Sequence, residues 1–282
     1  MTVRDELSRG VDRIGDREVR SASALVRTGR VYDLGLELNA SVPQGVAGVF
    51  TPFSFAWCHL PDENVSADVY DFAAESISGT PHIGTHIDGL MHATSGQRTF
   101  GGRHVRDVAS DQGFVVDGIE TVPPIVTRAV ICNVAGQLGF DRLPDGYEIT
   151  IADLDNVLAS SSMNIVLGDA VLVRTGKVTQ YGVDNAAYEA AQPGVGRDAA
   201  IWLYEQGMAV LGTDTTGTEP LPLSDQTRTT HQAMLVDRGV HLVENLNLEE
   251  LAADGVVEGM FICLALRITG ATGSWVRPVV IV

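Results

Sequence analysis

The chain has 282 residues, of which 45% are hydrophobic and 20% are charged, so it can bury a core of ordinary size. Its formal net charge of -17 at pH 7 excludes non-specific binding to nucleic acid or anionic lipid, which requires clustered Lys and Arg. No apolar run approaches the ~20 residues of a membrane span, and the three cysteines lack Cys-x-x-Cys spacing. We therefore expect a cytoplasmic protein without a membrane segment, disulfide framework or zinc-thiolate site, whose partners are small molecules.

Helices and strands alternate along the sequence. Residues 3–26 carry single apolar residues on one stripe among charges of both signs, which predicts an amphipathic helix that packs on a neighbour. The remaining predicted helices cover residues 151–160, capped by Thr150, and residues 197–206, 231–238 and 248–253. The predicted strands cover residues 129–134, 170–174, 208–211, 240–246, 260–269 and 276–282.

The pattern contains no internal repeat, low-complexity tract or linker, so we predict one α/β domain with a mixed sheet core over residues 31–282. Residues 1–30 are predicted to be an N-terminal helical arm.

Four metal-binding residue types crowd into a glycine-punctuated stretch, residues 80–92. They are His82, His86, Asp88 and His92. On an extended strand, alternate side chains share a face, so His82, His86 and Asp88 would point the same way, with Gly84 leaving room between the histidines. Two imidazoles and a carboxylate are typical ligands of zinc, manganese or iron, and a set of three leaves a coordination position open for water. The pattern therefore predicts a catalytic metal site.

His92 is not needed to complete this triad, and we interpret it as a proton shuttle or as an outer residue of the site. A second donor group, His231 and Glu244, lies towards the C-terminus. Glu244 stands among apolar residues, where a carboxylate is costly unless it is paired or bound to a metal. His241, in the same stretch, is predicted to be a surface residue.

Other functions remain open at this point. His86, Asp88 and His231 also satisfy the two-histidine, one-carboxylate triad of non-haem iron oxygenases, although His82 and His92 would then be unexplained. A non-catalytic binding protein on a hydrolase scaffold is the other class, against which the intact donor set speaks. Serine hydrolysis is disfavoured because no G-x-S-x-G motif occurs.

At these residues the chain resembles the cyclase family of metal-dependent hydrolases, which includes bacterial kynurenine formamidase and isatin hydrolase, with the hallmark H-x-G-T-H-x-D-x-P-x-H. The match runs from His82 to His92, and the similarity extends over most of residues 31–282, including residues 168–176 and 270–278. Three departures concern the substrate pocket: Leu90 and Trp275 replace prolines, and Gly217 stands where serine is common.

The resemblance implies a swivelling β/β/α fold, assembly as a homodimer or homotetramer, and one or two zinc or manganese ions per chain. His82, His86 and Asp88 would hold one ion, and His231 and Glu244 the second. In the isatin hydrolase branch, a glutamine is recruited instead, for which Gln232 is a candidate.

The expected activity is hydrolysis of the amide C–N bond of an aryl formamide, or of a cyclic amide such as an isatin-like lactam, by metal-activated water. His92 would carry the proton to the leaving group. Hydrolysis of a lactone or another cyclic ester at the same site is the alternative. Phe53, Phe55 and Trp57 could form aromatic walls for a flat substrate, although strand burial explains them equally well.

Overall fold

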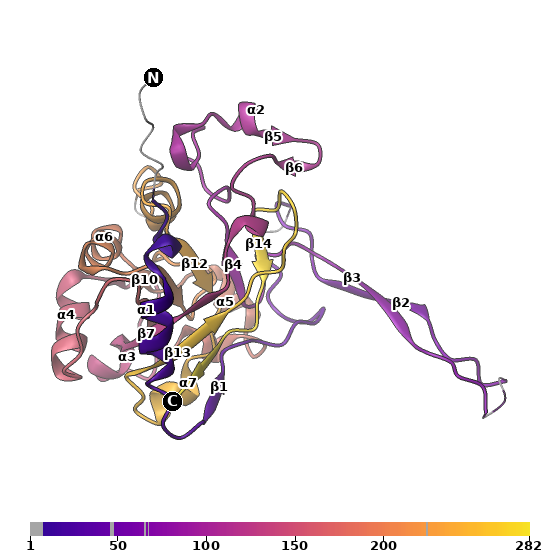
Figure 1. Cartoon of the computed structure of the whole chain (residues 1–282), viewed down its shortest axis with the longest axis horizontal. Coiled ribbons are helices and arrows are strands. Elements are labelled where there is room, and N and C mark those ends of the chain that lie inside the picture. The colour runs from indigo at the N-terminus through magenta and orange to yellow at the C-terminus, as the bar shows by residue number, and fades with distance from the viewer. Residues whose placement is uncertain (1–7, 46–47, 65, 67, 224) are drawn as a thin grey trace.

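A nine-stranded mixed sheet forms the centre of the protein (Figure 1). The computed structural model describes residues 8–45, 48–64, 66, 68–223 and 225–282. In sheet order the strands are β1 (Val31–Asp33), β15 (Val279–Ile281), β13 (Glu258–Cys263), β7 (Ile125–Asn133), β9 (Ala170–Arg174), β11 (Val210–Thr213), β12 (His241–Glu244), β4 (His86–Asp88) and β14 (Gly273–Trp275). The prediction of an α/β domain with a mixed sheet core is confirmed.

The middle of the sheet is parallel, because β7, β9, β11 and β12 run in the same direction, whereas the strands on either side pair antiparallel. Every residue of β9, β11 and β12 is buried, as expected for strands covered on both faces. This explains why the apolar run at residues 170–174 predicts its strand with the correct bounds.

Helices cover both faces of this sheet. The α-helices are α1 (Asp16–Ser23), α2 (Val105–Val108), α3 (Val134–Gln137), α4 (Ile151–Ser160), α5 (Asn185–Ala190), α6 (Arg197–Gln206) and α7 (Glu249–Ala253). The apolar residues of α4 and α6 pack in one core cluster, and those of α7 in a second cluster on the opposite face. Short 3-10 turns occupy Gly10–Arg13, Phe100–Gly102, Ile119–Thr121 and Lys177–Gln180. No helix among the described residues is long and apolar enough to cross a membrane.

Two helices have the predicted bounds because their ends are encoded locally. At α4, Thr150 Oγ1 accepts a hydrogen bond from the Asp153 amide, and the Asp153 carboxylate accepts one from the Thr150 amide. At α6, Gly207 ends the helix with a positive φ of 121°.

Three predictions of elements were wrong in detail. Residues 3–26 do not form one helix: a 3-10 turn precedes α1, with Gly15 between them, and residues 3–7 lie outside the described residues. The predicted strand 260–269 ends at Cys263. Residues 231–238 contain a π-helical turn, Gln232–Val236, instead of an α-helix.

Three small sheets lie outside the central one: β8 (Glu148–Ile149) with β10 (Gly194–Val195), β5 (Ala109–Ser110) with β6 (Gly113–Phe114), and β2 (Ser54–His59) with β3 (Ala74–Ser78). The β2–β3 pair projects away from the body of the molecule as a long hairpin (Figure 1). A strand at Phe55 and Trp57 was one of the two predicted explanations of their alternation, but these side chains are exposed and not buried, and β3 was not predicted.

Candidate metal-dependent active site

Strand β4 positions the first two functional side chains. It lies between β12 and β14, with His86 opposite Glu244 and Asp88 opposite Leu242. Because paired residues share a face of the sheet, the side chains of His86, Asp88 and Glu244 project to the same side. Ile87 projects to the other side, where it is fully buried in the core. The pairing of β4 with β12 therefore places three donor side chains on one face of the sheet, while the other face packs in the core.

His82 reaches the same place by a different route from the one predicted. Residues 82–85 are not an extended strand, and Gly84 has a φ of 58°, in the left-handed region. The turn therefore favours glycine for its conformation, and a Cβ at Gly84 would lie 2.4 Å from Leu38 Cδ2, so the Leu38 side chain would have to move. The Gly84 carbonyl accepts a hydrogen bond from His86 Nδ1 at 2.8 Å. His86 Nε2 therefore carries the lone pair that could bind a metal.

Asp88 is the point on which the donors converge. Its Oδ1 lies 2.8 Å from His82 Nδ1 and 3.5 Å from His86 Nε2, and its Oδ2 lies 3.3 Å from His231 Nε2 and 3.9 Å from His92 Nε2. The Oδ2 atom is buried, yet none of its neighbours among the described residues has hydrogen-bond geometry towards it.

The unpartnered Asp88 Oδ2 atom and the chemistry of the surrounding side chains both fit a divalent cation. Two groups have ligand atoms within 4.8 Å of one another: His82, Asp88 and His92, and His86, Asp88 and Glu244. The carboxylate of Asp88 belongs to both groups, and a buried carboxylate oxygen without a hydrogen-bond partner is costly unless a cation faces it.

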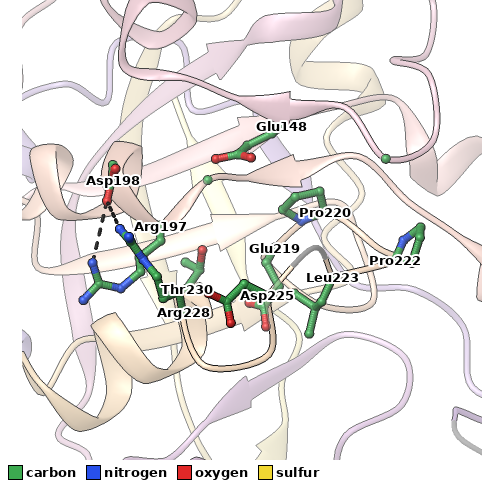
Figure 2. Close-up of a pocket in the computed structure, with 12 residues that line it drawn as sticks. Glu148, Arg197, Asp198, Glu219, Pro220, Pro222, Leu223, Asp225, Arg228 and Thr230 are labelled. Carbon is green, nitrogen blue, oxygen red and sulfur yellow. Dashed lines mark ion pairs between the residues drawn. The ribbon is translucent and has the colours of Figure 1, made fainter.

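His231 completes the site from the other side. Its Nε2 atom lies 3.5 Å from Glu244 Oε1, and its Nδ1 atom lies 2.5 Å from Glu219 Oε2. A carboxylate on the outer nitrogen of a histidine fixes the tautomer that leaves the inner nitrogen for a metal. Glu219 also lines a pocket of about 350 Å³ together with Glu148, Arg197 and Arg228. In this pocket both arginines are paired with Asp198 (Figure 2).

The electrostatics of the site shift the pKa values of its histidines in opposite directions. Burial would lower the pKa of His231, but Glu219 and Glu244 raise it well above the usual value. Burial would raise the pKa of Asp88, but the histidines around it, His92 first, hold it well below the usual range. Burial lowers the pKa of His92 to about 4, with Asp88 opposing the shift. His92 is therefore a neutral base at pH 7, stacked on the His82 ring at 3.9 Å between centroids.

The structure brings all six predicted site residues together: His82, His86, Asp88, His92, His231 and Glu244. Their individual roles stay predictions. The three residues of the oxygenase alternative also meet, so geometry alone does not separate the two chemistries. Gln232 does not join them, because its side-chain amide donates to the Thr94 carbonyl.

Two aromatic predictions and one histidine prediction need correction. Phe53 packs against Trp275, but Phe55 and Trp57 lie on the projecting hairpin and do not wall the site within this chain. His241 is buried and not on the surface, because β12 is a central strand, and its Nδ1 donates to the Asp88 carbonyl.

The residues that support the donors were not predicted from the sequence. Glu219 contacts His231, Thr218 donates to Glu244 Oε1 at 2.8 Å, and Thr272 Oγ1 lies 2.9 Å from His82 Nε2. Asn245 donates to the Gly84 carbonyl at 2.9 Å. No spacing rule marks such residues, because threonine and asparagine are common in loops and each reaches its partner only through the fold.

Comparison with known proteins decides the family. Residues 32–220 match the sequence model of the Cyclase family. The chain belongs to the Cyclase family. Among its curated relatives, the kynurenine formamidase of Bacillus mycoides (strain KBAB4) shares 36% sequence identity with this chain over 259 residues, which cover 90% of this chain and 99% of the relative. The predictions of the family and of a hydrolase acting on carbon–nitrogen bonds other than peptide bonds are confirmed.

Solved structures give the same family and fold. A crystal structure described as a novel cyclase superposes with a TM-score of 0.89 at 26% identity, covering 99% of this chain and 95% of that one. An isatin hydrolase bound to the product analogue thioisatinate has a TM-score of 0.69 at 20% identity, with 95% and 99% covered, and shows the likeness of fold alone.

Proposed function

We propose that the chain is a metal-dependent amidohydrolase that cleaves the C–N bond of a small aryl formamide. The convergence of four histidines on the two carboxylates Asp88 and Glu244, with Asp88 Oδ2 buried and unpartnered among the described residues, carries this proposal. The kynurenine formamidase relative, at 36% identity over most of both chains, supports a formamide over the lactam of the isatin hydrolases. A cyclic amide and a lactone are the alternatives on the same site.

The residues present suit two ions of zinc or manganese. His86, Asp88 and Glu244 form one ligand group within the fold, and His82 and Asp88 belong to the other. His231 lies between Asp88 and Glu244 and could complete either. When bound, a divalent cation supplies a water of lowered pKa and polarises the carbonyl group of the substrate.

The chain's own residues orient the metal-binding histidines and transfer protons. Glu219 and the Gly84 carbonyl hold His231 and His86 with their inner nitrogens free. His92 is neutral and partly open to solvent, so its Nε2 could accept a proton and donate it to the nitrogen that leaves the carbonyl.

A substrate panel tests the proposal. Full-length protein is assayed with N-formylkynurenine, isatin, a cyclic imide and a lactone, with and without a chelator. We expect the formamide to have the highest kcat/KM and every activity to require metal. Lactone or isatin as the preferred substrate would move the assignment to an alternative, and oxygen uptake with iron would replace hydrolysis by the oxygenase chemistry of His86, Asp88 and His231.

Cytoplasmic location is part of the same proposal. Of the three cysteines, Cys58 is exposed, Cys132 and Cys263 are buried, and none forms a disulfide. Free thiols suit a reducing compartment. We also propose that the protein is a homo-oligomer, either a homodimer or a homotetramer.

A further inference from the structure

The residue that follows β12 has a left-handed backbone conformation. Asn245 has a φ of 56°, comes directly after Glu244 and is 2% exposed. Its amide donates to the Thr215 carbonyl at 2.9 Å, and its carbonyl accepts from Thr85 Oγ1 at 2.6 Å. Glycine, asparagine and aspartate are the residues that adopt such a conformation most readily. The backbone at this position therefore favours one of these three residues, and asparagine also supplies an amide side chain.

This side chain connects the Gly84 turn to helix α5. Asn245 Nδ2 donates to the Gly84 carbonyl at 2.9 Å, and its Oδ1 accepts from the Tyr188 hydroxyl at 2.5 Å. The carbonyl can only accept a hydrogen bond. Burial raises the pKa of Tyr188, so its hydroxyl keeps its proton and donates. Both partners therefore require the same orientation of the Asn245 amide.

Tyr188 is itself held in packed structure. It is buried, the ring of Tyr181 meets it edge-on with centroids 5.5 Å apart, and Lys177 Nζ lies 5.8 Å from the centre of its ring. Lys177 is fully buried as well, and it donates to Asp145 Oδ1 and to the Ala187 carbonyl of α5. The Tyr188 hydroxyl is thus a fixed donor for Asn245.

The Gly84 carbonyl is the group that needs this support. It accepts hydrogen bonds from both Asn245 Nδ2 and His86 Nδ1, so both of its lone pairs are used. Glycine adopts φ angles of either sign at little cost, so the peptide group after Gly84 could otherwise rotate and turn its carbonyl away from His86. The hydrogen bond from Asn245 opposes this rotation.

The direction of this carbonyl affects which nitrogen of His86 is free for a metal. His86 Nε2 lies 3.4 Å from Glu244 Oε2 and 3.5 Å from Asp88 Oδ1. In the metal-free site these carboxylates favour a hydrogen on Nε2, whereas the Gly84 carbonyl favours one on Nδ1. Only a ring with its hydrogen on Nδ1 presents a lone pair on Nε2 beside the two carboxylates.

We propose that Asn245 is a positioning residue: anchored by Tyr188, it fixes the Gly84 carbonyl and thereby keeps the Nε2 lone pair of His86 available to a metal. Within the described part of the chain, its side chain is hydrogen-bonded to none of the six candidate donors, so it acts through the carbonyl. The inference rests on the proposed function in taking His86 as a metal ligand.

Two substitutions separate the amide donor from the backbone conformation. N245G removes the side chain, whereas N245D keeps its size and its acceptor for Tyr188 but not the donor, and both residue types tolerate the left-handed φ. The Kd of zinc, measured by competition with a chelator, should rise about 10- to 100-fold in each, the range for loss of a group that supports a ligand. The added negative charge of N245D would by itself strengthen cation binding, so a rise there favours loss of the donor as the cause.

Nuclear magnetic resonance measures the position of the hydrogen. In the metal-free wild type at alkaline pH, long-range proton–nitrogen spectra should place the hydrogen of the neutral His86 ring on Nδ1, with the signals assigned by comparison with H86Q. In N245G and N245D this hydrogen should move in part to Nε2. A general loss of stability does not select a tautomer, so this measurement separates positioning from a merely structural role.

The matched control is N247G, the same change in the same loop. Asn247 Oδ1 accepts from the Glu249 amide at the start of α7, away from the donors. N247G should keep the zinc Kd and the His86 tautomer of the wild type. Y188F, which removes the hydroxyl that anchors Asn245, should raise the zinc Kd in the same direction as N245G but by less. Circular dichroism checks that each variant folds.

A wild-type zinc Kd in folded N245G, or a His86 hydrogen that stays on Nδ1 in both N245G and N245D, would overturn the inference. An equal rise of the Kd in N247G would do the same. If N245G does not fold, N245D and Y188F decide by the same two measurements. If the wild type hydrolyses no formamide, the proposed function fails, whereas the zinc Kd and the tautomer still decide the role of Asn245.

Discussion

Asp88 joins every part of the candidate site, because its two oxygens face four histidines and its strand places it opposite β12. The hydrogen bonds of the surrounding histidines indicate which of them suit metal binding and which suits proton transfer. Histidines whose outer nitrogen is held by another group suit metal binding, and His86 and His231 are of this kind. His92 has no such support among the described residues, which suits a group that must gain and lose a proton.

Replacement of His92 tests this division. H92A should retain its metal content while kcat falls by ~10²- to 10⁴-fold, the range typical of general acid–base catalysis. Metal content by elemental analysis and steady-state kinetics measure the two effects. Loss of metal in H92A would instead make His92 a ligand of the group that contains His82 and Asp88.

Glu219 provides a second test at the same scale. E219Q keeps the shape of the side chain but removes the charge that holds His231, so metal affinity or activity should fall ~10- to 100-fold. E148Q is the matched control, because Glu148 lines the same pocket. Equal effects of the two changes would mean that the pocket, and not the contact with His231, matters.

Residue types and close spacing were enough to predict the donors of residues 82–92, because one short segment supplies them. The approach of Glu244 depends on the antiparallel pairing of β12 with β4, and that of His231 on the fold around Asp88, neither of which spacing encodes. Glu219 was missed for the same reason. His241 was misjudged because alternation along a strand identifies the surface face only when one face is open to water.

At the scale of elements, the turn before β4 sets the site. Gly84 has a left-handed φ, and a Cβ there would press on the Leu38 side chain, whereas Gly96 has a φ of 55° with open space around it. G96A should therefore cost only the backbone term of ~1–2 kcal/mol in the free energy of unfolding. G84A should cost a further ~1–3 kcal/mol from overpacking and should lower activity.

Denaturant unfolding with both variants separates these contributions. Equal losses of stability in G84A and G96A would show that the contact with Leu38 is easily relieved.

Elements with local signals were predicted well. The caps of α4 and the buried run of β9 are written in adjacent residues, so their bounds agree with the structure. Burial of Phe55 and Trp57 in a strand was wrong, and β3 was not predicted, because the apolar residues of the hairpin cover nothing within the described part of the chain. The strand 260–269 ends early because residues 264–268 continue the alternation without a neighbouring strand.

At the scale of the whole molecule, a net charge of -17 favours binding of cations over anions. The site adds a pH dependence. Burial alone would lower the pKa values of His86 and His231, but their carboxylate neighbours raise both above the usual value, that of His231 well above it, so protons compete with a cation for these side chains as the pH falls. A cation must displace these protons, and its affinity should fall as the pH falls.

Equilibrium dialysis at several pH values between 6 and 8 measures this effect. We expect the apparent Kd of zinc or manganese to rise up to about tenfold per pH unit for each proton displaced. A Kd that does not change over this range would contradict the competition between protons and the cation.

The most direct test of a hydrolase that depends on metal is the metal content of active protein. The chain is purified without added ions, analysed for bound elements, and assayed with an aryl formamide alongside D88N. We predict one or two zinc or manganese ions per chain, loss of turnover on chelation, recovery when metal returns, and loss of both metal and turnover in D88N. Full turnover by protein that contains no bound metal would contradict the account.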